Sequence, residues 1–86
     1  MSVLETSFYA KSKQIQTMSS MSDEDKLELY KYYKQSVNGD NTSSKPSMFD
    51  FVGNHKWNAW NSLNGMSKET AMQKYIDLVN FYLEKK

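Results

Sequence analysis

Apolar side chains recur along this chain at the spacing of an α-helix, and no segment alternates apolar and polar residues as a β-strand does. The first periodic segment predicts a helix over residues 3–18, and Ser2 with Glu5 has the spacing of a capping box at its start. The second predicts a helix over residues 23–37, which begins after a capping serine. The stripe of this second helix is Leu27, Tyr30, Tyr33, Lys34 and Val37.

Two further helices are predicted after a long polar connection. Residues 39–47 contain the single proline and are rich in turn-forming residues, which is typical of a loop. A third helix is predicted over residues 52–63, and a fourth begins after Ser67 and continues to the end of the chain. Four helices in 86 residues predict an all-α fold, a small bundle that forms one domain over residues 1–86.

Composition and charge narrow the functions that such a bundle can have. The absence of cysteine excludes disulfides and thiolate chemistry and agrees with a reducing cytoplasm. The net charge is +1 and all eleven cationic residues are lysines, which argues against nucleic acid as a partner because base and phosphate recognition favours arginine. No apolar run is long enough to span a bilayer, and no signal peptide is recognisable. We therefore expect a soluble cytoplasmic protein.

The stretch LYKYYKQ in the second helix concentrates tyrosine and lysine. Helical geometry places Tyr30, Tyr33 and Lys34 on one face, together with Leu27. Such a face can pack at the edge of the core, which spacing alone favours. It can also bind a ligand that has a flat ring and a phosphate, because aromatic rings stack and lysine binds phosphate oxygens. The residues by themselves leave both interpretations open.

No catalytic or metal site is apparent in the sequence. His55 is the single histidine, and no serine or acid forms a nucleophile motif around it. No spacing of residues suits a metal ion, and the acids of residues 23–25 are explained by the start of a helix. Trp57 and Trp60, three residues apart, are typical of core anchors rather than of a binding platform. The sequence predicts a protein that is not an enzyme and that holds no metal or cofactor.

Several motifs occur along the chain in an order that resembles a known family. LYKYYKQSVNGDN is followed by KPSMFDF and then by HKWNAWNSLNGMSKETAMQKYIDLV. Over residues 27 to 79 the chain resembles the acyl-CoA-binding protein family. Its members have a Leu-Tyr-x-x-Tyr-Lys-Gln helix, a Gly-Asp-Asn loop, a Lys-Trp-x-Ala-Trp helix and a final helix with Ala-Met-x-x-Tyr-Ile. Several spaced motifs in the same order make the resemblance specific.

The resemblance implies a four-helix bundle with an up-down-down-up arrangement and a shallow bowl that holds long-chain acyl-CoA. It assigns Tyr30, Lys34 and Lys56 to the 3′-phosphate region of CoA. It also implies that Tyr33 stacks on the adenine and that Tyr75 completes the nucleotide site. We expect a monomeric carrier of medium- to long-chain acyl-CoA that meets acyl-CoA-using enzymes or membranes transiently. The predicted ligand-binding residues are Leu27, Tyr30, Tyr33, Lys34, Lys56 and Tyr75.

The chain departs from the family pattern near the predicted pocket, at Lys26, Val52, Asn54 and His55. The connection between its first two helices is also short and lacks a proline. These departures bear on affinity and chain-length preference more than on ligand class. Two other functions stay open. One is a helical protein-interaction module that presents its tyrosines and tryptophans to a partner chain. The other is an acyl-CoA hydrolase or transferase with His55 as its candidate catalytic group.

Overall fold

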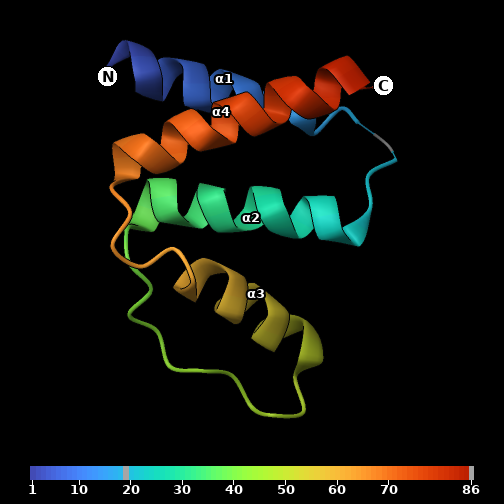
Figure 1. Ribbon diagram of the computed structural model, residues 1–86, viewed down its shortest axis with the longest axis vertical. Coiled ribbons are helices and arrows are strands. Elements are labelled where there is room, and N and C mark those ends of the chain that lie inside the picture. The colour runs from blue at the N-terminus through green and yellow to red at the C-terminus, as the bar shows by residue number, and fades with distance from the viewer. Residues whose placement is uncertain (19, 86) are drawn as a thin grey trace.

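The chain forms four helices, as the sequence predicts. The structure, a computed structural model, describes residues 1–18 and 20–85, and this part of the chain contains no strand. Figure 1 shows the helices side by side in the order α1, α4, α2, α3, with α1 and α4 running in one direction and α2 and α3 in the opposite one. This is the expected up-down-down-up arrangement. The helices are α1 (Val3–Ile15), α2 (Asp23–Asn38), α3 (Phe51–Asn61) and α4 (Lys68–Lys85).

Serine caps begin three of these helices where the sequence predicts them. The Ser2 hydroxyl accepts a hydrogen bond from the Glu5 backbone at 3.1 Å, and the Glu5 carboxylate accepts one from the Ser2 backbone at 3.2 Å, which completes the capping box. Ser22 and Ser67 each accept a hydrogen bond of 3.1 Å from the backbone three residues further on. Each cap satisfies an N–H group that the helix itself cannot, and is worth about 1 kcal/mol.

The bounds of three helices differ from the prediction. α2 ends one residue later than predicted, at Asn38. α1 ends at Ile15 rather than at residue 18, because the N–H groups of Thr17 and Met18 turn back to carbonyls three residues earlier. The Thr17 hydroxyl reinforces this tight turn by donating to the Gln14 carbonyl at 2.7 Å. α3 begins one residue earlier than predicted and ends two residues earlier, and Asp50 is its N-cap.

The core lies where α1, α2 and α4 meet. Phe8 is fully buried there, and its ring centroid lies 5.4 Å from that of Tyr33 and 4.9 Å from that of Tyr75. The stripe predicted for the first helix is Leu4, Phe8, Ile15 and Met18, and that predicted for the last is Met72, Tyr75, Ile76, Val79 and Leu83. These stripes supply most of the buried side chains, so the two predicted core faces are confirmed. The buried apolar residues are Phe8, Ile15, Leu29, Ala71, Met72, Tyr75, Ile76, Val79 and Tyr82.

The stripe predicted for the second helix is not the face that α2 turns to the core. Leu29 is the apolar residue of α2 that is buried, and Tyr32 packs against the same cluster. Tyr33 and Val37, both members of the predicted stripe, are each 37% exposed. α2 packs against α4 on one side and against α3 on another, so it has two packed faces. A sequence pattern with one apolar stripe per helix can represent only one of these two packed faces.

A polar hub joins the end of α2 to the turn that precedes α4. The fully buried Gln35 donates through Nε2 to Asp40 Oδ1 at 2.9 Å and to the Met66 carbonyl at 2.8 Å. Asp40 Oδ1 also accepts a hydrogen bond from the Gly65 backbone at 2.8 Å. The Gly65 N–H, and next the Gln35 amide, lower the pKa of the Asp40 carboxyl because both favour its charged form.

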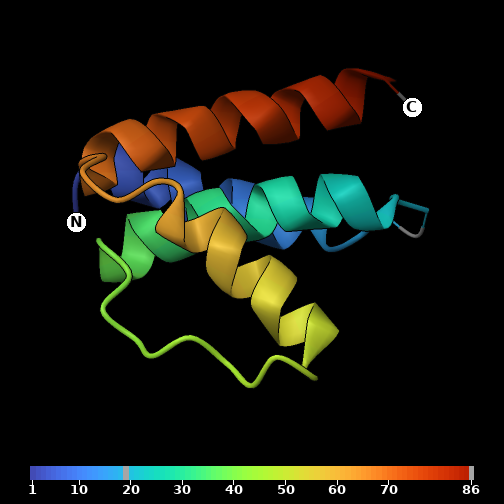
Figure 2. The same ribbon diagram turned by 60° about the horizontal axis from the view of Figure 1, so that its bottom comes forward.

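The two tryptophans of α3 hold the long loop rather than the core. Trp60 Nε1 donates to the Gly39 carbonyl at 2.9 Å, and Trp57 Nε1 donates to the Ser43 carbonyl at 3.1 Å. Neither ring is fully buried, and α3 has no buried residue at all. The prediction that these residues anchor the core is therefore wrong, because both rings lie outside the core cluster and bind the loop. Figure 2 shows α3 and this loop on the side of α2 away from α4.

Replacing the residue at the centre of the core should destabilise the protein strongly. We expect Phe8→Ala to lower the free energy of unfolding by about 3 to 5 kcal/mol, because it removes a fully buried ring and leaves a cavity. Urea denaturation followed by circular dichroism measures this change. The matched control is Phe49→Ala, whose ring is 80% exposed and whose loss should change stability by no more than about 0.5 kcal/mol. Equal losses in the two variants would contradict the assigned core.

The hub should make stability depend on pH in the acid range. Folding lowers the pKa of Asp40 below its usual value of 3.8, so its contribution is present above that value and is lost as the pH falls through the folded-state pKa. We expect Asp40→Asn to flatten the acid limb of a plot of unfolding free energy against pH. Glu84→Gln, at an exposed position near the end of α4, should leave that limb unchanged. An acid limb that is the same in Asp40→Asn as in the parent would show that the hub does not set it.

Candidate functional site

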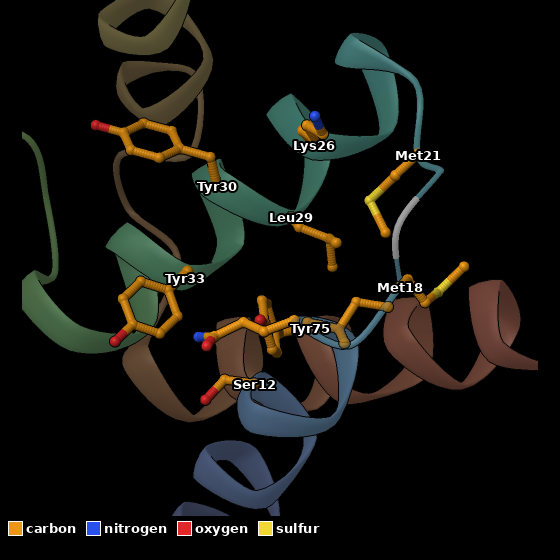
Figure 3. Close-up of a pocket in the computed structure, with 10 residues that line it drawn as sticks. Ser12, Met18, Met21, Lys26, Leu29, Tyr30, Tyr33 and Tyr75 are labelled. Atoms are coloured by element: carbon orange, nitrogen blue, oxygen red, sulfur yellow. The ribbon is translucent and has the colours of Figure 1, made fainter.

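A cavity of about 480 Å³ lies between α1, α2 and the turn that joins them, with one residue from α4. Figure 3 shows that Tyr33 and Ser12 lie at one end of it and that Met18 and Met21 lie at the other. Leu29 points into the space between the two ends. The cavity therefore has one end with hydroxyl groups and one end that is apolar. Such a division suits an amphiphilic ligand better than a uniformly polar one.

One face of the Tyr33 ring packs against the core, and the ring is partly exposed to solvent. It stacks on Phe8 with an interplanar angle of 26°, and its centroid lies 5.9 Å from that of Tyr75. Because the ring is held in place by packing yet remains 37% exposed, it offers a preformed surface on which a flat ligand ring can stack.

Tyr75 contributes a neutral hydroxyl to the same cavity. The residue is buried, and this burial, with a smaller effect of Tyr33, raises the pKa of its phenol to about 12. At neutral pH the phenol is therefore protonated. It can donate a hydrogen bond to an acceptor on a ligand that enters the cavity.

A second cavity, of about 500 Å³, lies between the first half of α2 and α3. Leu27 and Tyr30 line it from α2, and Lys56 lines it from α3. Lys26 and Tyr30 line both cavities, so the two adjoin each other along α2. Together they form a surface hollow that passes from the junction of α1 and α2 to the side of α3.

Two lysines at this surface lie against aromatic rings. The Nζ atom of Lys34 is 4.7 Å from the centroid of the Trp60 ring, and that of Lys56 is 5.3 Å from the centroid of the Tyr30 ring. In the part of the chain that the structure describes, neither lysine forms an ion pair, whereas Lys31 Nζ lies 3.0 Å from Glu28 Oε1. The rings restrict the two ammonium groups without neutralising them, so both charges remain available to an anionic ligand.

Five of the six residues of the predicted ligand site line the two cavities. Tyr33 and Tyr75 line the first, Leu27 and Lys56 line the second, and Tyr30 lines both. Lys34 lines neither of them and lies on the Trp60 ring beside α3. Five of the six side chains therefore border the joined cavities, and the roles of all six toward a ligand stay predictions.

None of the residues that α1 and the following turn contribute to the cavity was predicted as a site residue from the sequence. Ser12, Ile15, Gln16, Met18 and Met21 make up half of the ten residues that line the first cavity. Ile15 and Met18 were expected in the core stripe of the first helix, and no role was predicted for Met21. Helical periodicity does not distinguish an apolar side chain in the core from one that lines a cavity. α1 and α2 both pack against α4, and this shared packing brings these side chains to the site.

Three of the four departures from the family pattern also line the cavities. Lys26 lines both, whereas Val52 and His55 line the second. Asn54 instead supports the start of α3, since its amide donates to the carbonyls of Ser47 at 2.7 Å and Asp50 at 2.8 Å. The first three positions are therefore the ones at which this chain can alter ligand preference.

Among the described residues, no cluster of three or more histidine, cysteine, aspartate or glutamate side chains is placed to hold a metal ion. None of the described helices combines the length and the apolar character needed to cross a bilayer.

Comparison with known proteins identifies relatives over most of the chain. Residues 5–79 match the family model described as "Acyl CoA binding protein". "Acyl-CoA-binding protein homolog 1" of Caenorhabditis elegans is 42% identical over 66 residues, which cover 77% of each chain. The crystal structure of Oryza sativa Acyl-CoA-Binding Protein 2 superposes with a TM-score of 0.91 and 38% sequence identity, covering 95% of this chain and 92% of that one.

Larger proteins also contain a segment that is similar to this chain. "Enoyl-CoA delta isomerase 2" of Rattus norvegicus is 53% identical over 58 residues, which are 67% of this chain but 15% of the isomerase. This chain therefore spans a small part of that relative and most of the length of the nematode protein.

Titration of the tyrosines tests the environment assigned to Tyr75. A raised pKa means that the folded state favours the protonated phenol, so this contribution to stability is present below pH 10 and is lost as the pH rises toward 12. Nuclear magnetic resonance of protein labelled in the tyrosine rings, with the signal assigned through Tyr75→Phe, should show Tyr75 still protonated at pH 10.0, the usual midpoint. A Tyr75 signal already half titrated there would contradict the burial of this phenol.

Proposed function

This chain belongs to the acyl-CoA-binding protein family, and on that basis we propose that it binds medium- to long-chain acyl-CoA esters and shields their acyl chains. The observation that carries the proposal is the pair of adjoining cavities, which combine aromatic and cationic side chains with an apolar end. We further propose that residues 1–86 act as one monomeric domain in the cytoplasm. There it maintains a pool of acyl-CoA and meets acyl-CoA-using enzymes or membranes transiently.

The nucleotide end of the ligand is proposed to lie where the tyrosines and lysines gather. Tyr33 offers a partly open ring for the adenine, and Tyr75 offers a neutral hydroxyl beside it. Lys34 and Lys56, together with the Tyr30 hydroxyl, would meet the 3′-phosphate region, because neither ammonium forms an ion pair with a described residue and each is positioned by an aromatic ring. Leu27 would contribute apolar contact from the second cavity.

The acyl chain is proposed to supply most of the affinity. Each buried methylene contributes about 0.8 kcal/mol, so roughly ten of them contribute about 8 kcal/mol before ordering costs. A lysine–phosphate contact contributes about 1.5 to 3 kcal/mol. Affinity should therefore rise with chain length until the apolar surface is covered and should then level off.

We propose that the protein carries its ligand without changing it. His55, the candidate catalytic group from the sequence, is exposed at the second cavity, and no hydrogen bond orients it within the described residues. A hydrolase or transferase would need a base held within hydrogen-bonding distance of a nucleophile at the thioester. Incubation with acyl-CoA and a reagent for free thiols should show no release of CoA above the rate without protein.

Isothermal titration with CoA, a free fatty acid and CoA esters of increasing chain length tests the binding function. Tight binding of the long esters, weak binding of CoA and no binding of the free acid would support a carrier that uses both ends of the ligand. Absence of heat with every ligand would contradict the proposal. It would favour the alternative in which the fold serves as a protein-interaction module.

Substitution of the proposed nucleotide contacts should weaken binding of CoA esters of every chain length by a similar energy. Lys34→Met keeps the aliphatic stem of the side chain but removes its charge, and should cost about 1.5 to 3 kcal/mol of binding free energy. Tyr33→Ala should have an effect in the same direction because it removes the stacking surface. Lys74→Met, at an exposed position of α4, is the matched control and should bind like the parent. Unchanged affinity for long esters in Lys34→Met and Tyr33→Ala would show that the nucleotide lies elsewhere.

A further inference from the structure

The hydroxyl of Ser12 is a fixed hydrogen-bond acceptor at the wall of the first cavity. Ser12 lies on α1, lines this cavity and is 8% exposed. A serine hydroxyl has one proton, and that of Ser12 is donated to the Tyr9 carbonyl at 2.8 Å. Among the described residues, no group donates a hydrogen bond to the Ser12 oxygen. Its lone pairs are therefore available to a group that enters the cavity.

Ser12 lies beside the ring on which a flat ligand can stack. Phe8 precedes Ser12 by about one helical turn on α1, and its ring stacks on that of Tyr33 with the centroids 5.4 Å apart. Figure 3 shows Ser12 and Tyr33 at the same end of the cavity. A base that stacks on the exposed part of the Tyr33 ring would therefore present one of its edges to Ser12.

The proposed phosphate contacts determine which edge of the base faces Ser12. Lys56 belongs to α3, and Lys34 lies on the Trp60 ring of the same helix. Ser12 belongs to α1, and Figure 1 shows α1 and α3 at opposite edges of the bundle. In a purine nucleotide, the 6-position lies across the ring system from the bond to the sugar. A base whose sugar and phosphate point towards α3 therefore directs its 6-position towards α1 and Ser12.

We propose that Ser12 selects a 6-amino purine over a 6-keto purine in the ligand, an inference that rests on the proposed binding of acyl-CoA. The amino group of adenine carries hydrogens that the Ser12 oxygen can accept. The keto oxygen of hypoxanthine or guanine carries only lone pairs, so two acceptors would face each other. Turning the Ser12 hydroxyl towards that keto oxygen would break its bond to Tyr9. Either arrangement of a 6-keto purine costs one hydrogen bond.

The other polar side chains that line this cavity do not make the same distinction. Most of them carry a phenol or an amide, which can either donate or accept a hydrogen bond, and they are Gln16, Tyr30, Tyr33 and Tyr75. Lys26 can only donate, but it precedes Tyr33 by about two helical turns on α2. Figure 3 shows Leu29 between Lys26 and Ser12. Ser12 is therefore the group at this end of the cavity whose hydrogen-bonding role is fixed.

The test compares two ligands that differ in the base alone. One is a long-chain ester of CoA, and the other is the same ester with hypoxanthine in place of adenine. Isothermal titration of the parent should give an affinity about five- to tenfold higher for the adenine ester, which corresponds to one net hydrogen bond. Ser12→Ala should bring the two affinities to within about twofold of each other, because it removes the fixed acceptor.

Ser62→Ala is the matched control for this substitution. The Ser62 hydroxyl donates to the Ala59 carbonyl at 2.6 Å, three residues earlier in the chain, as the Ser12 hydroxyl does to Tyr9. Ser62 lines neither of the two cavities, so Ser62→Ala should keep the parental ratio of affinities. That ratio isolates recognition of the base, because a loss of stability or of acyl-chain contact lowers both affinities alike.

Two results would overturn the role of Ser12. One is equal affinity of the parent for the two esters, which would leave acyl-CoA binding itself supported. The other is a preference for adenine that Ser12→Ala retains, and loss of that preference in Gln16→Ala would assign recognition of the base to Gln16. Binding of neither ester by the parent would overturn the proposed function together with this inference.

Discussion

The hydrogen bonds of Gln35 with Asp40 and Met66 determine where α3 lies, and the second cavity depends on that position. α3 contributes no fully buried residue, and within the described part of the chain it packs against α2 alone. Hydrophobic burial therefore cannot fix its orientation by itself. The hub ties the end of α2 to the turn after α3, and the indoles of Trp57 and Trp60 tie the loop before α3 to α3 itself. Because hydrogen bonds are directional, they specify one arrangement where a small apolar contact would allow several.

The core and the candidate ligand site share side chains. Phe8 is fully buried, yet it supports the Tyr33 ring that borders the first cavity, and Tyr75 belongs to the core cluster while it lines the same cavity. A domain of 86 residues has little interior, so the surface that binds a ligand cannot be separate from the surface that stabilises the fold. Changes on the cavity side of this cluster should therefore affect stability as well as binding.

The lysines of this protein have the same side chain but differ in whether their ammonium group is paired with a carboxylate. Lys31 is paired with Glu28, whereas Lys34 and Lys56 lie over aromatic rings without an acidic partner in the described part of the chain. An unpaired ammonium that is held by a ring keeps its charge for a ligand. The net charge of +1 conceals this division, since it counts each lysine equally.

The sequence by itself determined the four helices, the serine caps of α1, α2 and α4, and the core faces of α1 and α4, because these features depend on local hydrogen bonding and on one periodic stripe. Its motifs indicated the family, which the match over residues 5–79 shows. Only the tertiary structure decided that α2 packs on two faces and that the tryptophans hold the loop. It also decided that Ser12, Met18 and Met21 face a cavity. These features arise between segments distant in the chain, and a periodic pattern records that a side chain is apolar but not which neighbour covers it.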